Sequence, residues 1–176
     1  TQRTTLSETL RRIAAGGMPN RGPLIAAANL VPEGAQFLSL TYNATQGSRS
    51  YRLYIPANRP ATPMPLIVML HGCTQTPEDF AAGTGMNALA EEFGCMIAYP
   101  AQPSKANAQK CWNWFKPQDQ ARGRGEPSLI AGIVGEVAQR HGVATDRIFV
   151  AGLSAGAAMA VVMGEAYPEL FAGVGV

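Results

Sequence analysis

The sequence predicts an α/β protein with a mainly parallel sheet flanked by helices, and three observations support this class. Continuous apolar runs at residues 66–70 and 95–99 are typical of strands that are buried on both faces. Stretches with the apolar spacing of helices alternate with these runs. A β-prone run at residues 147–151 leads into a Gly-x-Ser-x-Gly turn at residues 152–156 and then a helix-prone stretch. Strands that alternate with helices form parallel sheets, because each helix carries the chain back across the sheet.

Length and composition indicate one globular domain with a short extension before it. The chain has 176 residues, of which 47% are hydrophobic and 15% charged, which is enough for a real core. A Thr-x-x-Glu capping box at residues 5–8 predicts a short helix that ends at Gly16, so residues 1–35 are interpreted as an N-terminal helix and loop extension. The net charge of +2 indicates neither a nucleic-acid nor a membrane partner.

The domain itself is expected to begin at residue 36 with a hairpin. Residues 36–42 and 50–55 alternate apolar and polar side chains, and residues 43–49 are interpreted as their connection. After the first buried run, apolar residues at helical spacing predict a helix over residues 86–93, which Gly94 ends. The second buried run follows directly.

The second half of the domain is expected to hold a long loop, two helices and two strands. Residues 100–126 are polar with an embedded aromatic cluster and are interpreted as the loop. A helix is predicted from after Pro127 to Gly142, and another over residues 155–167 beyond the Gly-x-Ser-x-Gly turn. A further strand begins near Phe171, which makes six strands in all. The apolar face of the first helix consists of Leu129, Ile130, Ile133, Val134 and Val137.

The Gly-x-Ser-x-Gly turn predicts a serine nucleophile. Between a strand and a helix, such a turn holds its serine in a strained backbone conformation with the hydroxyl exposed above the edge of the sheet. Gly152 and Gly156 fit this reading, because a side chain at either position would clash where strand and helix nearly touch. We therefore expect Ser154 to attack an electrophilic carbonyl.

A serine nucleophile also needs two N–H donors for the developing oxyanion. One is the N–H of the residue after the serine, here Ala155. The other comes from the loop after the third strand, residues 71–75, which we call the oxyanion loop, and we assign it to the Cys73 N–H. Gly72 would let this backbone come close to the substrate carbonyl.

The base that would activate the serine is missing from the sequence. In this arrangement the chain order is Ser, then Asp or Glu, then His, yet no histidine follows Ser154. His71 is interpreted as a structural residue beside the oxyanion loop, and His141 as a cap at a helix end. The sequence therefore predicts a nucleophile and an oxyanion hole without the rest of a catalytic triad.

Three motifs occur in order along the chain: residues 65–80 with His-Gly-Cys-Thr-Gln, residues 111–115 with Cys-Trp-Asn-Trp-Phe, and residues 146–157 around the serine. Together they resemble the poly(3-hydroxybutyrate) depolymerase family of esterases, which is itself similar to feruloyl and acetylxylan esterases. The resemblance covers about residues 36–176. It implies an α/β-hydrolase fold and cleavage of carboxylic esters through an acyl-enzyme.

The same resemblance implies Ser154 as nucleophile and Cys73 and Ala155 at the oxyanion hole, with no metal or organic cofactor. The family's Asp and His lie on loops after later strands than this chain has. We therefore hypothesise that residues 36–176 are the N-terminal part of an α/β-hydrolase domain, truncated after about six strands, and that the remainder of the same esterase carries the Asp and the His. In another class of function, the chain is a catalytically silent fragment that serves only as a binding or structural module.

The substrate is expected to be a hydroxyalkanoate oligomer or a small ester, with a feruloyl or acetylxylan type of carbohydrate esterase as the alternative. Trp112 and Trp114 are interpreted either as an apolar wall for the substrate or as packing under the long loop. Gln75 either contacts substrate or braces the oxyanion loop, and we favour bracing. Since Cys95 falls in a buried strand, Cys73 and Cys111 are the pair that a disulfide would join, and a reduced pair stays open. A secreted or periplasmic location is favoured over a cytoplasmic one.

Overall fold

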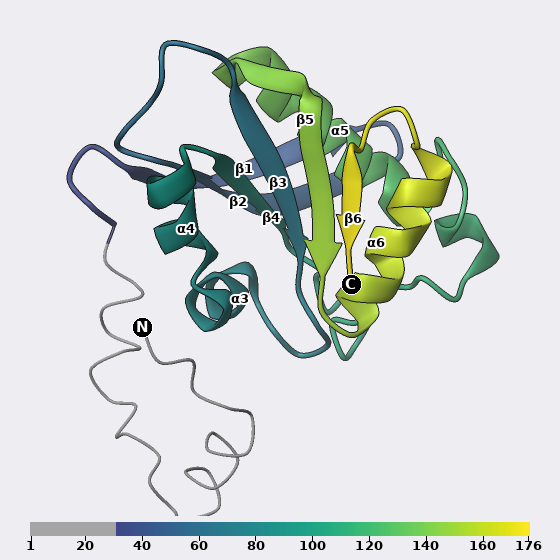
Figure 1. Ribbon diagram of the computed structural model, residues 1–176. Coiled ribbons are helices and arrows are strands. Elements are labelled where there is room, and N and C mark those ends of the chain that lie inside the picture. The colour runs from purple at the N-terminus through teal and green to yellow at the C-terminus, as the bar shows by residue number, and fades with distance from the viewer. Residues whose placement is uncertain (1–30) are drawn as a thin grey trace, which may run out of the picture. The chain divides into compact units, whose positions relative to one another are not determined.

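The computed structural model describes residues 31–176, so the helix predicted in the N-terminal extension lies outside the described residues. Strands and helices alternate through most of the described chain (Figure 1). The elements are β1 (Gln36–Ala44), β2 (Gly47–Ile55), β3 (Met64–Leu70), α3 (Pro77–Thr84), α4 (Met86–Phe93), β4 (Met96–Pro100), the 3-10 helix η1 (Pro117–Asp119), α5 (Gly125–His141), β5 (Val143–Gly152), α6 (Ala155–Ala166) and β6 (Gly173–Gly175).

The six strands form a single sheet in the order β1-β2-β4-β3-β5-β6. The β1–β2 and β2–β4 pairs are antiparallel, and the remaining pairs are parallel. The predicted α/β class with a mainly parallel sheet is therefore confirmed. Because β3, β4 and β5 run the same way, the loops that follow them meet at one edge of the sheet, which is where open α/β sheets bind their ligands.

Helices cover both faces of the sheet, and β3 shows how the core is divided between them. Its Leu66, Val68 and Leu70 belong to the large core under α5 and α6. Its Ile67 and Met69 belong to the smaller core under α3 and α4 (Figure 1). The strand is thus covered on both faces, as its continuous apolar run predicts.

The predicted hairpin exists, but its predicted connection is wrong. Only Thr45 and Gln46 separate β1 from β2, whereas the alternation of apolar residues placed the whole of residues 43–49 in the connection. Backbone pairing continues through the polar ends of both strands, because the ladder's hydrogen bonds do not depend on side-chain polarity. As a result Arg49 lies on β2, and it is buried.

The first two helices differ from expectation in their number and their burial. Residues 77–84 form α3, which was not predicted although its N-terminus carries a signal: Thr76 and Asp79 make a reciprocal capping box. The predicted helix over residues 86–93 is confirmed as α4. Of its apolar residues Ala90 is buried, whereas Leu89 and Phe93 are exposed.

Helix α5 begins at Gly125, before the start predicted at Pro127. The early start has a cap that is not adjacent in the sequence: the Asp119 carboxylate accepts a hydrogen bond of 2.8 Å from the N–H of Glu126 in the first turn. Strand β5 likewise begins at Val143, before the β-prone run that predicted it. Within the part of the chain that the structure describes, no helix combines the length and apolar character needed to cross a membrane.

Candidate active site

Ser154 occupies the sharp turn between the end of β5 at Gly152 and the start of α6 at Ala155. Its backbone angles are φ 54° and ψ −120°. A residue with a side chain pays conformational energy for a positive φ, and such strain is concentrated at functional sites. The side chain is exposed. The predicted strand, turn and helix around this serine are confirmed.

Both glycines of the turn are required by close backbone contacts. A Cβ on Gly156 would overlap the carbonyl oxygen of Leu70, the last residue of β3. A Cβ on Gly152 would overlap the backbone of Gly156 itself. The Leu153 N–H also donates a hydrogen bond of 3.1 Å to the Leu70 carbonyl. The serine turn is therefore packed directly against the end of β3.

The loop after β3 is held in place by the side chain of its own Gln75 and by a backbone hydrogen bond to the long loop after β4. Its Gly72 N–H donates a hydrogen bond of 2.8 Å to Gln75 Oε1. The Thr74 N–H donates a hydrogen bond of 2.6 Å to the Gln109 carbonyl. Gln75 therefore braces the oxyanion loop, which is the role that we favoured for it over substrate contact.

Two backbone amides near the serine turn have no hydrogen-bond acceptor among the described residues. A Cβ added to Gly72 would lie 3.5 Å from the Leu153 carbonyl oxygen, so the loop after β3 lies against the serine turn. Within residues 31–176 neither the Cys73 N–H nor the Ala155 N–H donates a hydrogen bond. Free, preorganised N–H groups are what an oxyanion hole requires, and these two are the predicted donors.

His71 is committed to holding the oxyanion loop. Its side chain is buried, Nδ1–H donates a hydrogen bond of 2.7 Å to the Gly72 carbonyl, and Nε2 accepts one of 3.0 Å from the Gln102 N–H. Burial lowers the pKa of this imidazole, and the positive charges of Lys110 and Arg49 lower it further, against the hydrogen bond to Gly72. His71 is thus neutral and has no free nitrogen for Ser154, which confirms the structural role predicted for it.

His141 lies too far from the serine to act as its base. It is the last residue of α5 and precedes β5, whereas Ser154 follows the far end of that strand. A strand of 10 residues spans about 30 Å. Burial lowers the pKa of His141, with Arg140 and Arg59 adding to the effect. The described residues therefore provide Ser154 with no histidine base.

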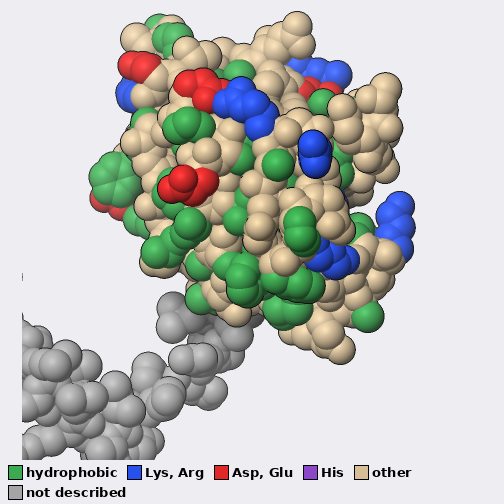
Figure 2. Space-filling model, turned by 90° about the vertical axis from the view of Figure 1, so that its right-hand side faces the viewer, with side chains coloured by type: hydrophobic (Ala, Val, Ile, Leu, Met, Phe, Trp, Pro, Cys, Tyr) green, Lys and Arg blue, Asp and Glu red, His purple; other side chains and the backbone are tan. Residues whose placement is uncertain are grey.

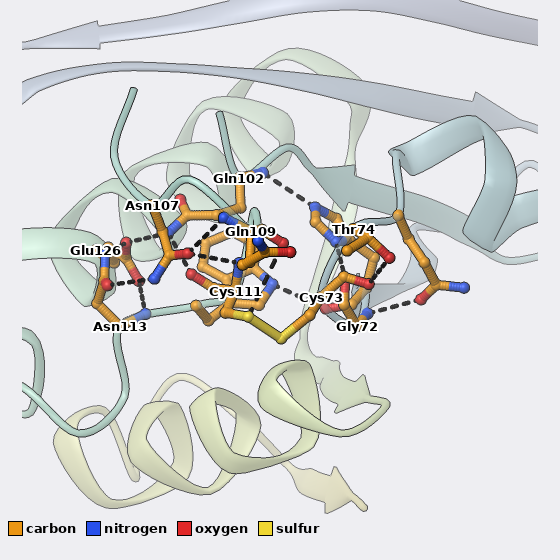
Figure 3. The surroundings of a disulfide bond; sticks show 12 residues. Gly72, Cys73, Thr74, Gln102, Asn107, Gln109, Cys111, Asn113 and Glu126 are labelled. Atoms are coloured by element: carbon orange, nitrogen blue, oxygen red, sulfur yellow. Dashed lines mark hydrogen bonds between the residues drawn. A yellow bond between two sulfur atoms is a disulfide. The ribbon is translucent and has the colours of Figure 1, made fainter. Parts of the chain in front are cut away.

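A disulfide joins the oxyanion loop to the long loop that follows β4. Cys73 and Cys111 are bonded, with their Cα atoms 4.2 Å apart (Figure 3). Cys95 is buried and is the free thiol. The pairing that the sequence favoured is confirmed. The bond ties the backbone at Cys73 to the long loop at Cys111, 38 residues further along the chain.

The two tryptophans of the long loop have different environments. Trp112 is fully buried, and its Nε1–H donates a hydrogen bond of 3.1 Å to the His71 carbonyl. It packs in the core and cannot touch substrate, so the predicted substrate wall is wrong for Trp112. Trp114 is 42% exposed, and its ring packs edge to face against the ring of Phe115 with the two ring centroids 5.9 Å apart. Trp114 therefore remains a candidate for substrate contact.

A buried polar cluster behind the disulfide was not predicted. It consists of Arg49, Gln102, Asn113 and Glu126, which come from β2, the long loop and the start of α5. Both oxygens of the Glu126 carboxylate accept hydrogen bonds of 2.8 Å from Asn113, one from its backbone and one from its side chain (Figure 3). Each residue reads as an ordinary loop or surface polar residue, because its partners are distant in sequence.

Comparison with known proteins identifies the family. The model of the family described as esterase PHB depolymerase matches residues 49–176. The chain belongs to this esterase family. The matched region begins within β2 and runs to the end of the chain, so it contains Ser154 and the loop that carries Cys73.

Similar proteins include depolymerases and carbohydrate esterases. The chain is 40% identical over 132 residues to poly(3-hydroxyalkanoate) depolymerase C of Paucimonas lemoignei, covering 75% of this chain and 31% of the relative. It is 34% identical over 119 residues to feruloyl esterase B of Neurospora crassa, covering 67% of this chain and 39% of the relative. The chain thus spans about a third of the length of these curated relatives.

The fold is also that of solved esterases. The acetyl xylan esterase from Aspergillus awamori superposes with a TM-score of 0.71 at 28% sequence identity, covering 81% of this chain and 52% of that one. A thermostable esterase superposes with a TM-score of 0.59 at 20% identity, covering 82% of this chain and 40% of that one. The α/β-hydrolase fold that the motifs implied is therefore confirmed.

Proposed function

We propose that the esterase hydrolyses carboxylic esters through an acyl-enzyme formed on Ser154. The serine Oγ bonds to the ester carbonyl carbon as its proton passes to a base, and the carbonyl oxygen becomes an oxyanion facing the N–H groups of Cys73 and Ala155. The alcohol then leaves with a proton, and water releases the acid and restores the serine. The observation that carries this proposal is a strained, exposed serine on a turn that packs against the loop of Cys73, with the Cys73 and Ala155 N–H groups donating no hydrogen bond within residues 31–176.

The base and the residue that orients it are proposed to come from sequence beyond the described residues of this esterase. His71 has both ring nitrogens engaged, and His141 lies at the other end of β5. The curated relatives are also considerably longer than this chain. A polypeptide restricted to residues 1–176 is accordingly expected to show no turnover.

The proposed substrates are oligomers of hydroxyalkanoates or small esters. The first relative is named a poly(3-hydroxyalkanoate) depolymerase, and the exposed aromatic pair Trp114 and Phe115 offers apolar contact area on the loop tied to the oxyanion hole. Feruloyl or acetylated xylan esters are the second candidate, favoured by the likeness to a feruloyl esterase and an acetyl xylan esterase.

The proposed location is outside the cytoplasm, because disulfides such as Cys73–Cys111 form and persist in oxidising compartments and are rare in the cytosol. This disulfide constrains the loop that carries a proposed oxyanion donor, so the proposed activity is expected to depend on the two cysteines being oxidised.

The proposal is tested with the whole protein that carries this chain and its Ser154→Ala variant. Hydrolysis of 3-hydroxybutyrate oligomers, methyl ferulate and acetylated xylan is measured side by side. We expect the oligomers to have the highest kcat/KM and the variant to lose at least about 10³-fold in kcat. Equal rates for both proteins would exclude Ser154 as nucleophile. A wild-type protein inactive on all three substrates and unlabelled by a fluorophosphonate would instead support the silent binding or structural module.

A further inference from the structure

Gln102 forms hydrogen bonds with two groups that hold the oxyanion loop, the His71 ring and the Cys111 backbone. Its backbone N–H donates a hydrogen bond of 3.0 Å to His71 Nε2, and the same ring holds the Gly72 carbonyl. Its side-chain Nε2 donates a hydrogen bond of 2.9 Å to the Cys111 carbonyl. Cys111 is in turn bonded to Cys73, whose N–H is the proposed oxyanion donor. Figure 3 shows Gln102 together with Cys111 and the disulfide to Cys73.

The orientation of the Gln102 amide is dictated by two buried charges. Its Oε1 accepts a hydrogen bond from Arg49, and its Nε2 donates to a Glu126 carboxylate oxygen as well as to Cys111. A guanidinium can only donate and a carboxylate only accepts, so the amide can lie in one orientation and no other. Arg49, Gln102 and Glu126 are all buried, which makes each of these hydrogen bonds expensive to break.

The cluster is anchored to rigid elements on both sides of the loop. Arg49 comes from β2, and its guanidinium also donates a hydrogen bond of 3.1 Å to the Ala101 carbonyl. Glu126 lies in the first turn of α5, where the helix dipole favours its negative charge. Buried charges cost free energy of desolvation, so a cluster of this kind is a poor source of stability. The cluster instead fixes the Gln102 side chain relative to β2 and α5, and that side chain in turn holds the Cys111 carbonyl.

We propose that Gln102 is a positioning residue for the oxyanion hole: its side-chain amide holds Cys111, and through the disulfide Cys73, where the Cys73 N–H meets the substrate oxyanion. This inference rests on the proposed ester hydrolysis. The inference goes beyond the proposed hydrolysis, because it makes catalysis depend on a residue that does not touch the substrate. Its loss should weaken binding of the transition state, and leave binding of the substrate nearly as it was.

The test uses the variant Gln102→Met in the whole protein, which keeps the side-chain length and removes both the acceptor and the donor. Removing an oxyanion donor outright costs about 10²–10³-fold in kcat, so displacing one is expected to lower kcat about 10- to 100-fold. KM should stay within about threefold. Both constants are measured on a soluble ester, with thermal unfolding as the check that the variant is folded.

The matched control is Tyr54→Phe. It also removes a hydrogen bond of a buried side chain, the one of 2.6 Å from the Tyr54 hydroxyl to Glu91, but in the core on the α3 and α4 face. This variant should lose stability and keep kcat within about twofold of the wild type.

A folded Gln102→Met enzyme with unchanged kcat, or one whose KM alone rises, would overturn the inference. So would an equal loss of kcat in Tyr54→Phe. Should Gln102→Met fail to fold, Gln102→Glu is measured in the same way: it keeps the acceptor for Arg49 but sets a second carboxylate against Glu126, and the same loss of kcat at pH 8 is expected. An inactive wild type would count against ester hydrolysis itself, which separates that failure from this one.

Discussion

At Gly156 the first turn of α6 comes so close to the end of β3 that only a hydrogen atom fits, because a Cβ would overlap the Leu70 carbonyl oxygen. Gly156→Ala should therefore push the helix away from β3 and displace the neighbouring Ser154. We expect the variant to lose about 3 kcal/mol of free energy of unfolding. Urea denaturation measures the stability, and fluorophosphonate labelling in the whole protein measures the serine.

Gly135 is the matched control, because it also lies within a helix and a Cβ there would meet nothing within 4 Å. Gly135→Ala should raise the free energy of unfolding by about 1 kcal/mol, since alanine is the better helix former. Equal effects of the two substitutions would show that the close approach at Gly156 does not matter.

A second effect at the scale of residues concerns His71 and pH. Burial keeps its pKa below the ordinary value, which is about 6.5. Below that pH the unfolded chain binds a proton that the native protein does not, so the free energy of unfolding falls as the pH falls, by at most about 1.4 kcal/mol per pH unit. Above it the contribution of His71 is fully present. Urea denaturation at pH 7.5 and 5.5 measures the loss.

The variant His71→Gln isolates this contribution, because its amide can still accept from the Gln102 N–H and does not titrate. It should lose less stability between pH 7.5 and 5.5 than the wild type. His141→Gln is measured in parallel, since the pKa of His141 is lowered as well. An unchanged pH dependence in His71→Gln would mean that His71 already titrates normally.

At the scale of elements, the disulfide joins the turn after β3 to the loop after β4 across a sequence separation of 38 residues. Closing a loop of this length restricts the unfolded chain, which amounts to about 4 kcal/mol in the chain-entropy account. The double variant Cys73→Ala with Cys111→Ala should lose stability of that order in urea denaturation. Added reductant should destabilise the wild type and have no further effect on the double variant, and a reductant effect on both would point away from this bond.

Elements also show where local patterns succeed. The strand β3 and the buried face of α5 were predicted correctly, because the residues that each element buries are apolar and recur in the sequence with the spacing of that element. The start of α5 was not, because Asp119 caps it from seven residues upstream through the Glu126 N–H. Likewise β1 and β2 run through polar residues whose pairing depends only on backbone geometry.

At the scale of the whole molecule, one side of the described chain presents an apolar surface. Val161 of α6 is 47% exposed and Val174 of β6 is 45% exposed. Both line a shallow hollow of about 460 Å³. In the view of this side, hydrophobic side chains cluster mainly toward the lower part, and charged side chains lie among those above (Figure 2). Exposed apolar surface beside a short edge strand favours association.

A polypeptide of residues 1–176 is therefore expected to self-associate at micromolar concentrations, and Val161→Lys should reduce this. Size-exclusion chromatography with light scattering measures the mass. Val31→Lys is the control, because Val31 is 43% exposed but does not line the hollow. Monomers at every concentration, or equal effects of the two substitutions, would contradict the expectation.

The α/β class, the strand–turn–helix at Ser154 and the loop after β3 follow from residues close together in the sequence, where periodicity and the steric needs of Gly152 and Gly156 are visible. Other features depend on groups that meet only on folding. The burial of Trp112 is one, and the cluster around Gln102, whose partners lie 53 and 24 residues away, is another. Buried polar groups must find hydrogen-bond partners wherever the fold offers them, and no local pattern records which ones they find.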